Sequence, residues 1–100
     1  MDDCQKAMEL AFEAAHNVEV GDFNFKEKNY EGAWLRYTDA VQEKPGDAAI
    51  HVRLGRVLEK AKQIPNAIEE YKAAQALAGP EKWSDEAKAA LLRLQHPPAK

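Results

Sequence analysis

The chain has almost no cysteine and few histidines: Cys4 is the only thiol among 100 residues, and His16, His51 and His96 lie far apart. A single thiol excludes an intramolecular disulfide and a cysteine-based zinc site. The histidines follow no metal-ligand spacing, Cys4 has no candidate base, and no glycine-rich phosphate loop occurs. We therefore expect no metal, no cofactor and no catalytic activity.

Long hydrophobic runs and a positive charge excess are also missing. No stretch reaches the ~18 apolar residues that span a bilayer, and no secretory leader precedes the domain. The formal net charge is −3, whereas nucleic acids and anionic membranes require a concentrated positive surface. We expect a soluble chain without either partner, cytoplasmic by default. The compartment is undetermined, because Met1 also suits a start placed on a segment excised from a larger protein, its leader or neighbouring domain removed.

The residues that are abundant favour helix. Ala, Glu, Lys and Leu are the most frequent residues, β-branched runs are few, and 45% of the residues are hydrophobic. This composition predicts one all-α domain that buries a core.

The sequence repeats itself at an offset of 34 residues. Small, aromatic and apolar positions all obey this period, which indicates duplication of a structural unit. The matched pairs are Gly21 and Gly55, Ala33 and Ala67, Tyr37 and Tyr71, Ala40 and Ala74, Val18 and Val52, Val20 and Leu54, Phe23 and Val57, Tyr30 and Ile64, and Trp34 and Ile68.

Apolar spacing and turn residues predict that each unit is a helical hairpin. In the first unit we expect a helix over 3–28 and another over 30–43, capped by Asn29. In the second we expect a helix over 48–61, capped by Asp47, and another that starts near Pro65 and stops at Gly79-Pro80. The repeated glycines and alanines permit close helix crossings, and the repeated tyrosines should fill the space between one hairpin and the next.

The two ends complete the array. Ser84 resembles an N-cap, and an apolar stripe through Ala87, Ala90, Leu91 and Leu94 predicts a capping helix over 84–95, followed by a tail over 96–100. At the other end nothing breaks the helical pattern between residues 3 and 28. We expect one long helix; the alternative is that residues 3–13 end a truncated earlier hairpin. The apolar side of the extension, with Met8 and Phe12, would be buried on the second helix or exposed for self-association as a homodimer.

The 34-residue pattern resembles the tetratricopeptide repeat (TPR) family. The residues that carry the resemblance are Gly21, Ala33, Tyr37, Ala40 and Pro45 in repeat one (14–47), and Gly55, Ala67, Tyr71 and Ala74 in repeat two (48–81). Departures are Asn17 and His51 where the family has Trp, Asn24 and Leu58 where it has Tyr, and Gly79 where it has Pro. The resemblance implies a right-handed α-solenoid of antiparallel hairpins, about five helices in all, in a single domain over 1–100.

The resemblance also implies a function, which is to bind a peptide or protein segment on the concave face without catalysis. Helical spacing places a set of residues on that face. They are Val18, Asp22, Phe25 and Lys26 in repeat one, and Val52, Arg53, Arg56 and Lys60 in repeat two.

Two interpretations of the basic residues remain open. Arg53 and Arg56 could grip carboxylates of an acidic partner, or could be neutralised internally by Glu19 and Asp22. Asp22 would repel the chain-terminal carboxylate that some TPR relatives clamp, so we expect no such clamp. The alternative function is structural, as a self-association or spacer domain of a larger assembly.

Overall fold

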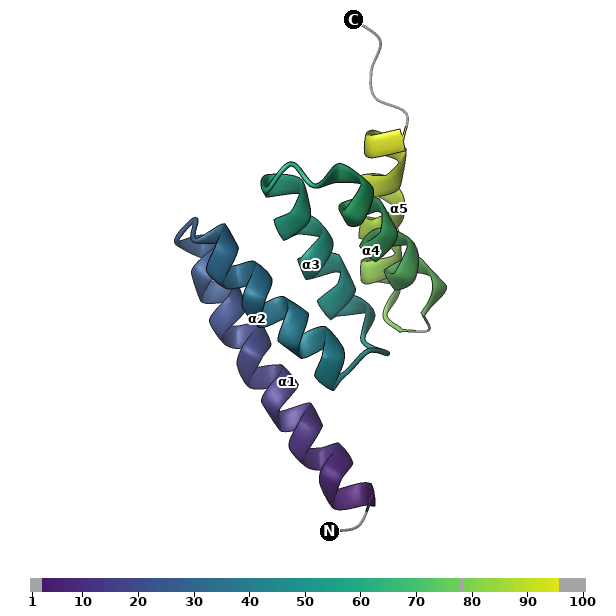
Figure 1. Ribbon diagram of the computed structural model, residues 1–100. Coiled ribbons are helices and arrows are strands. Elements are labelled where there is room, and N and C mark those ends of the chain that lie inside the picture. Colours follow the sequence, from purple (N-terminus) through teal and green to yellow (C-terminus); the bar gives the residue numbers. More distant parts are fainter. Residues whose placement is uncertain (1–2, 78, 96–100) are drawn as a thin grey trace, which may run out of the picture. The chain divides into compact units, whose positions relative to one another are not determined.

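The structure is a computed structural model that describes residues 3–77 and 79–95. Within these residues it is all-helical, with five helices and no strand (Figure 1). The helices are α1 (Asp3–Lys26), α2 (Tyr30–Glu43), α3 (Ala48–Lys60), α4 (Ile64–Ala76) and α5 (Glu81–Gln95). The chain forms two compact units, Met1–Gly46 and Asp47–Lys100, which are described separately.

In the first unit, α1 packs against α2 as a hairpin. Helix α2 begins where Asn29 accepts a hydrogen bond from the Gly32 amide at 3.1 Å, which confirms the predicted cap. The buried side of the hairpin is narrow and consists mostly of small residues around one aromatic ring. These residues are Ala14, Asn17 and Gly21 on α1, and Ala33, Tyr37 and Ala40 on α2.

In the second unit, α3 packs against α4, and α5 packs against both. The predicted cap of α3 is confirmed, because Asp47 accepts from the Ala49 amide at 2.9 Å. Pro65 lies in the first turn of α4, where no amide hydrogen is needed. Ala67, Tyr71 and Ala74 of α4 are buried, as are Ala87, Ala90 and Leu91 of α5.

The turns inside the two hairpins have the same hydrogen bonds. Lys28 and Lys62 adopt left-handed φ values of 64° and 65°. The next amide in each turn, of Asn29 or Gln63, donates to the carbonyl of Asn24 or Leu58 at 2.8 Å. Both turns are therefore Schellman motifs, in which lysine occupies the position where glycine is common. The 34-residue period thus extends to backbone geometry.

The repeated tyrosines lie inside their own hairpins. A Cβ atom on Gly21 would lie 2.5 Å from Cε1 of Tyr37, and one on Gly55 would lie 2.8 Å from Cε1 of Tyr71. We had expected these rings to fill the space between one hairpin and the next. The structure corrects that expectation: each ring packs on the glycine of the facing helix, which has no side chain to exclude it.

The start of α5 also differs from the prediction. The helix begins at Glu81 and not at Ser84, because the Pro80 carbonyl already accepts a hydrogen bond from the Trp83 amide at 3.1 Å. Glu81 then lies in the first turn, where a negative charge suits the helix dipole. The predicted tail, 96–100, lies outside the described residues.

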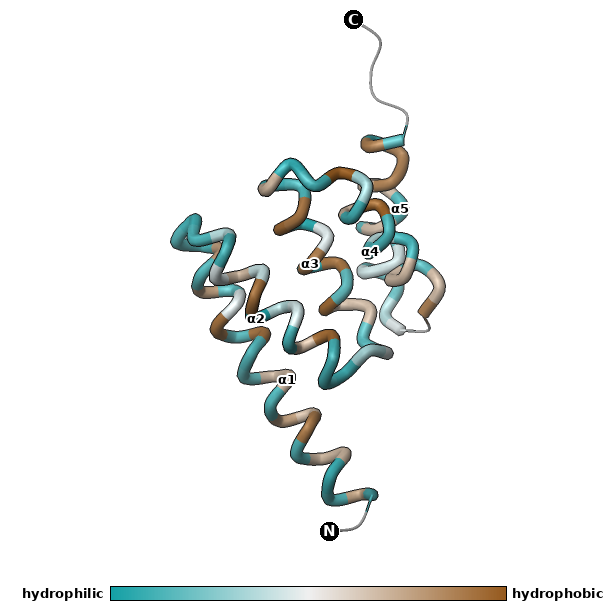
Figure 2. The backbone as a smooth tube through the Cα atoms, in the orientation of Figure 1, coloured by the Kyte–Doolittle hydropathy of each residue, from teal (hydrophilic) through white to brown (hydrophobic). Residues whose placement is uncertain are grey.

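Helix α1 is unbroken from Asp3, so residues 3–13 are not the end of an earlier hairpin. Its first three turns extend past the end of α2, and Figure 2 shows hydrophobic positions recurring along them. Met8 is 73% exposed and Phe12 is 80% exposed. We had expected this apolar side either to be buried on the second helix or to be exposed, and the structure shows it exposed.

Candidate binding site

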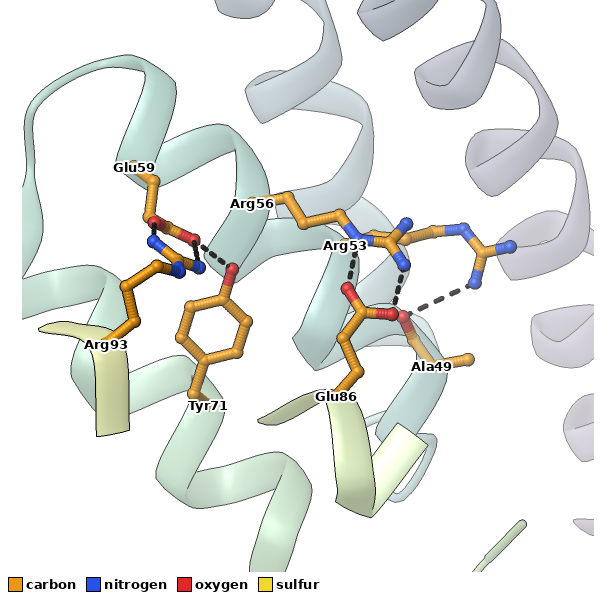
Figure 3. A network of polar contacts seen from close by, with 7 residues as sticks. All are labelled: Ala49, Arg53, Arg56, Glu59, Tyr71, Glu86 and Arg93. Atoms are coloured by element: carbon orange, nitrogen blue, oxygen red, sulfur yellow. Dashed lines mark hydrogen bonds and ion pairs between the residues drawn. The ribbon is translucent and has the colours of Figure 1, made fainter. Parts of the chain in front are cut away.

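The second unit contains a polar network between α3 and α5 (Figure 3). Three positions on α3, at steps of three, face positions on α5 in the same order along both helices. Arg53 faces Trp83, Arg56 faces Glu86, and Glu59 faces Arg93. The charges are complementary at the last two pairs, so this network holds α5 in register on α3.

Arg56 binds Glu86 through both arms of its guanidinium. Its Nε donates to Oε2 of Glu86 at 2.5 Å, and its Nη2 donates to Oε1. This forked geometry is the one in which arginine binds carboxylates most strongly. The two side chains are 38% and 36% exposed, so the pair lies at the surface, open to exchange with another carboxylate.

Trp83 lies at the centre of three cationic side chains. The Arg53 and Arg56 guanidinium carbons lie 5.1 and 5.8 Å from its ring centroid, and the Lys82 ammonium lies 4.7 Å from it. Aromatic faces attract cations within about 6 Å. Arg53 also donates to the Ala49 carbonyl at 3.4 Å, one turn earlier on α3. Trp83 and Arg53 are half-buried, so the cluster is partly accessible to solvent.

A second cluster joins all three helices of the unit. The carboxylate of Glu59 accepts a hydrogen bond from the hydroxyl of Tyr71 at 2.5 Å and another from Nη1 of Arg93 at 2.5 Å. Burial raises the pKa of the Glu59 carboxyl. The hydrogen bonds from Arg93 and Tyr71 lower this pKa, and together with nearby positive charge they outweigh burial, so the pKa lies below its usual 4.5. Burial, and then the same carboxylate, raise the pKa of the Tyr71 phenol. Glu59 is therefore held as a charged anchor for α5.

The residues that we had predicted for a binding face differ in exposure. In the second unit, Val52 is fully buried and supports the face without lining it, while Lys60 is exposed. In the first unit, Lys26 is exposed and Val18 is half-buried. The pairing proposed between the arginines and Glu19 or Asp22 joins different units and stays a prediction.

Two of the predicted residues in the first unit have partners within it. Asp22 accepts a hydrogen bond from the Tyr37 hydroxyl at 2.5 Å. The half-buried Phe25 ring meets the Tyr30 ring edge-on, with centroids 5.4 Å apart. The first contact links α1 to the middle of α2, and the second links α1 to the first residue of α2.

Two of the positions that depart from the TPR pattern, 17 and 51, are buried and polar. Asn17 accepts from Arg36 at 3.1 Å and donates to Glu43 at 2.7 Å. His51 lies 2.8 Å from the carboxylate of Glu70. Because Arg36 and Glu70 are also 34 residues apart, the two hairpins join equivalent positions with different side chains. These residues bridge the helices of a hairpin, which is a structural role.

Sequence reasoning did not identify Trp83, Glu86 and Arg93 as members of this site. With the helix assumed to start at Ser84, Trp83 fell in a loop. A start at Glu81 would have placed Trp83, Glu86 and Arg93 on one helical face, which was the available signal.

The described residues contain no group of three or more His, Cys, Asp or Glu side chains suited to a metal ion. Among the same residues, no helix has the length and apolar character to cross a bilayer. No family model matches the chain, and neither a curated protein nor a solved structure matches it.

Proposed function

We propose that this chain is a non-catalytic protein-interaction module, built from two TPR-like hairpins, that binds an acidic segment of a partner protein. The observation that carries the proposal is the cationic cluster of Arg53, Arg56 and Lys82 around Trp83. An extended acidic segment suits it, because arginine forks bind carboxylates and the indole ring packs against the aliphatic part of the same side chain.

The hairpin repeat supports the family part of the proposal. The glycine–tyrosine crossing, the left-handed lysine and the bridge from position 17 or 51 all recur after 34 residues. In a right-handed solenoid of such hairpins, the first helix of each would line a concave face. The partner would then also meet Val18, Asp22, Phe25 and Lys26 of the first unit and Lys60 of the second.

The test is fluorescence anisotropy with a labelled peptide of alternating Glu and Ser, compared with its Gln and Ser counterpart. We expect binding of the acidic peptide alone, weakening as salt is added because the contacts are charged. Lys82→Glu and Arg53→Glu should each reduce affinity by tenfold or more. Lys72→Glu, the same charge change at an exposed position of α4, is the matched control.

Trp83→Leu tests the aromatic part, and circular dichroism checks that each variant keeps its helices. Unchanged affinity in the Lys82→Glu, Arg53→Glu and Trp83→Leu variants at low salt would show that the acidic segment does not bind here. Binding of the neutral peptide with equal affinity would reject the acidic specificity.

A further inference from the structure

The first three turns of α1 form a helix that α2 does not cover. Glu43, the last residue of α2, reaches Asn17 of α1 through a 2.7 Å hydrogen bond. Ala14 is the first buried residue of α1, and before it only Leu10 is even half-buried among residues 3–13. Isolated helices of this length are marginal in water, so a packing partner would stabilise the segment.

One side of this extension is apolar, with large residues set among small ones. Met8 and Phe12 lie one turn apart and are largely exposed. By helical spacing they share a side with Cys4, Ala11 and Ala15, with Ala7 at its edge. All of these side chains are exposed. The charged residues of this segment lie elsewhere on the helix, so no charge interrupts the apolar side. By helical spacing Glu9 lies on its flank, and Lys6 and Glu13 lie on the opposite side of the helix.

We propose that this side docks on the same side of a second copy of the chain, as an antiparallel two-fold helix pair. The pattern of large and small residues selects the register. When the two-fold axis passes between residues 9 and 10, Phe12 faces Ala7 of the second copy and Met8 faces Ala11 of the second copy. Cys4 then faces Ala15 of the second copy. Each larger side chain meets an alanine, and the two-fold axis repeats the fit on the other half.

A parallel pair fits less well. It would set Phe12 against Phe12 and Met8 against Met8, with gaps at the alanine layers between them. It would also bring the two first units, each with ten acidic and five basic residues over 1–46, to the same end of the pair. The antiparallel pair places these acidic bodies at opposite ends and lowers their repulsion.

The available area sets the strength of the dimer. One large aromatic side chain buries roughly 150–250 Å², so Met8, Phe12 and the small residues supply less than the ~800 Å² per partner of a standard stable interface. The dimer is therefore weak and depends on concentration. It does not involve the cationic cluster around Trp83, so it stands independently of the proposed function.

The single native thiol gives a test of both the dimer and its register. In the antiparallel pair the two Cys4 residues lie about 16 Å apart along the helices, too far for a disulfide. The variant Ala15→Cys places a thiol opposite Cys4 of the second copy. Under mild oxidation we expect this variant to form a covalent dimer on a non-reducing gel, whereas the native chain and the Cys4→Ser/Ala15→Cys variant do not.

Two substitutions on α1 separate the docking side from general surface effects. Phe12→Glu in the Ala15→Cys background should abolish cross-linking and, without the added cysteine, leave a monomer in sedimentation equilibrium at every concentration. Phe23→Glu, at a 62% exposed position outside the extension, should change neither. A native chain that stays monomeric at millimolar concentration would overturn the proposal, as would cross-linking through Cys4 alone. Phe12→Glu should bind the acidic peptide normally.

Discussion

The ring of Tyr71 occupies the place where a side chain on Gly55 would stand: a Cβ there would lie 2.8 Å from both Cε1 and Cζ. Tyr37 and Gly21 have the same relationship in the first unit, where the distance is 2.5 Å. In each hairpin, therefore, one glycine permits one aromatic side chain to fill the crossing between helices.

Replacing either glycine by alanine should destabilise its unit, although alanine favours helix by about 1 kcal/mol. Overpacking a closed core costs about 1–3 kcal/mol, so we expect a net loss of about 1–2 kcal/mol for Gly55→Ala and more for Gly21→Ala. Urea unfolding measures the loss. Gly46→Ala is the control, since a Cβ there meets nothing within 4 Å; equal effects at positions 46 and 55 would contradict the close-packing explanation.

The left-handed lysines predict a stabilising change. A non-glycine residue in this conformation costs about 1 kcal/mol. Glycine removes that cost, but it loses more conformational entropy on folding than lysine does, which offsets part of the gain. Lys28→Gly and Lys62→Gly should each raise the free energy of unfolding by up to about 1 kcal/mol, seen as a higher urea midpoint with an unchanged slope. Lys28→Ala and Lys62→Ala retain the strained backbone and should give no gain. A gain from alanine equal to that from glycine would assign the effect to lost charge.

The Glu59 anchor predicts a pH dependence of stability. Its pKa in the folded state lies below the usual 4.5, so it contributes stability that is fully present above about pH 5 and is lost as the pH falls through the folded-state pKa. Glu59→Gln should cost about 1 kcal/mol at pH 7, and this difference from the native chain should shrink to nothing near pH 2. Thermal unfolding at pH 7, 5 and 3 follows the trend; a constant difference would mean that the Glu59 charge is not responsible.

The fork between Arg56 and Glu86 predicts a gain of binding. In the proposed function, Glu86 competes for the guanidinium that a partner carboxylate would use. Glu86→Gln should therefore tighten binding of the acidic peptide several-fold while loosening α5 slightly. Asp85→Asn removes the same charge at the neighbouring, more exposed position and serves as the control. Equal gains in both variants would indicate a general charge effect with no role for the fork.

Local sequence signals predicted most helix boundaries, because caps and turns act within a few residues. Asn29 and Asp47 begin their helices as predicted, and α2 spans the predicted residues. Ser84 shows the limit of such signals. A good capping residue does not start a helix when a proline four residues earlier already supplies the first carbonyl acceptor.

The candidate site was less predictable, because its members meet across helices. The sequence placed Arg53 and Arg56 on one face of α3, but their contacts with Trp83 and Glu86 depend on how α5 docks. Glu59 bonds to Tyr71 and Arg93 from two other helices, and the sequence pattern indicates neither bond. Helical periodicity gives the direction of a side chain and cannot give the partner that it meets.

The cross-helix polar bonds described above also affect the order in which parts of the chain fold. The longest of them, between Arg93 and Glu59, spans 34 residues, so these bonds close soon after the residues that make them emerge from the ribosome. Structures dominated by such near-neighbour pairings fold quickly, and their early parts do not wait for the late ones. We therefore expect the first hairpin to be formed while the last helix is still being synthesised.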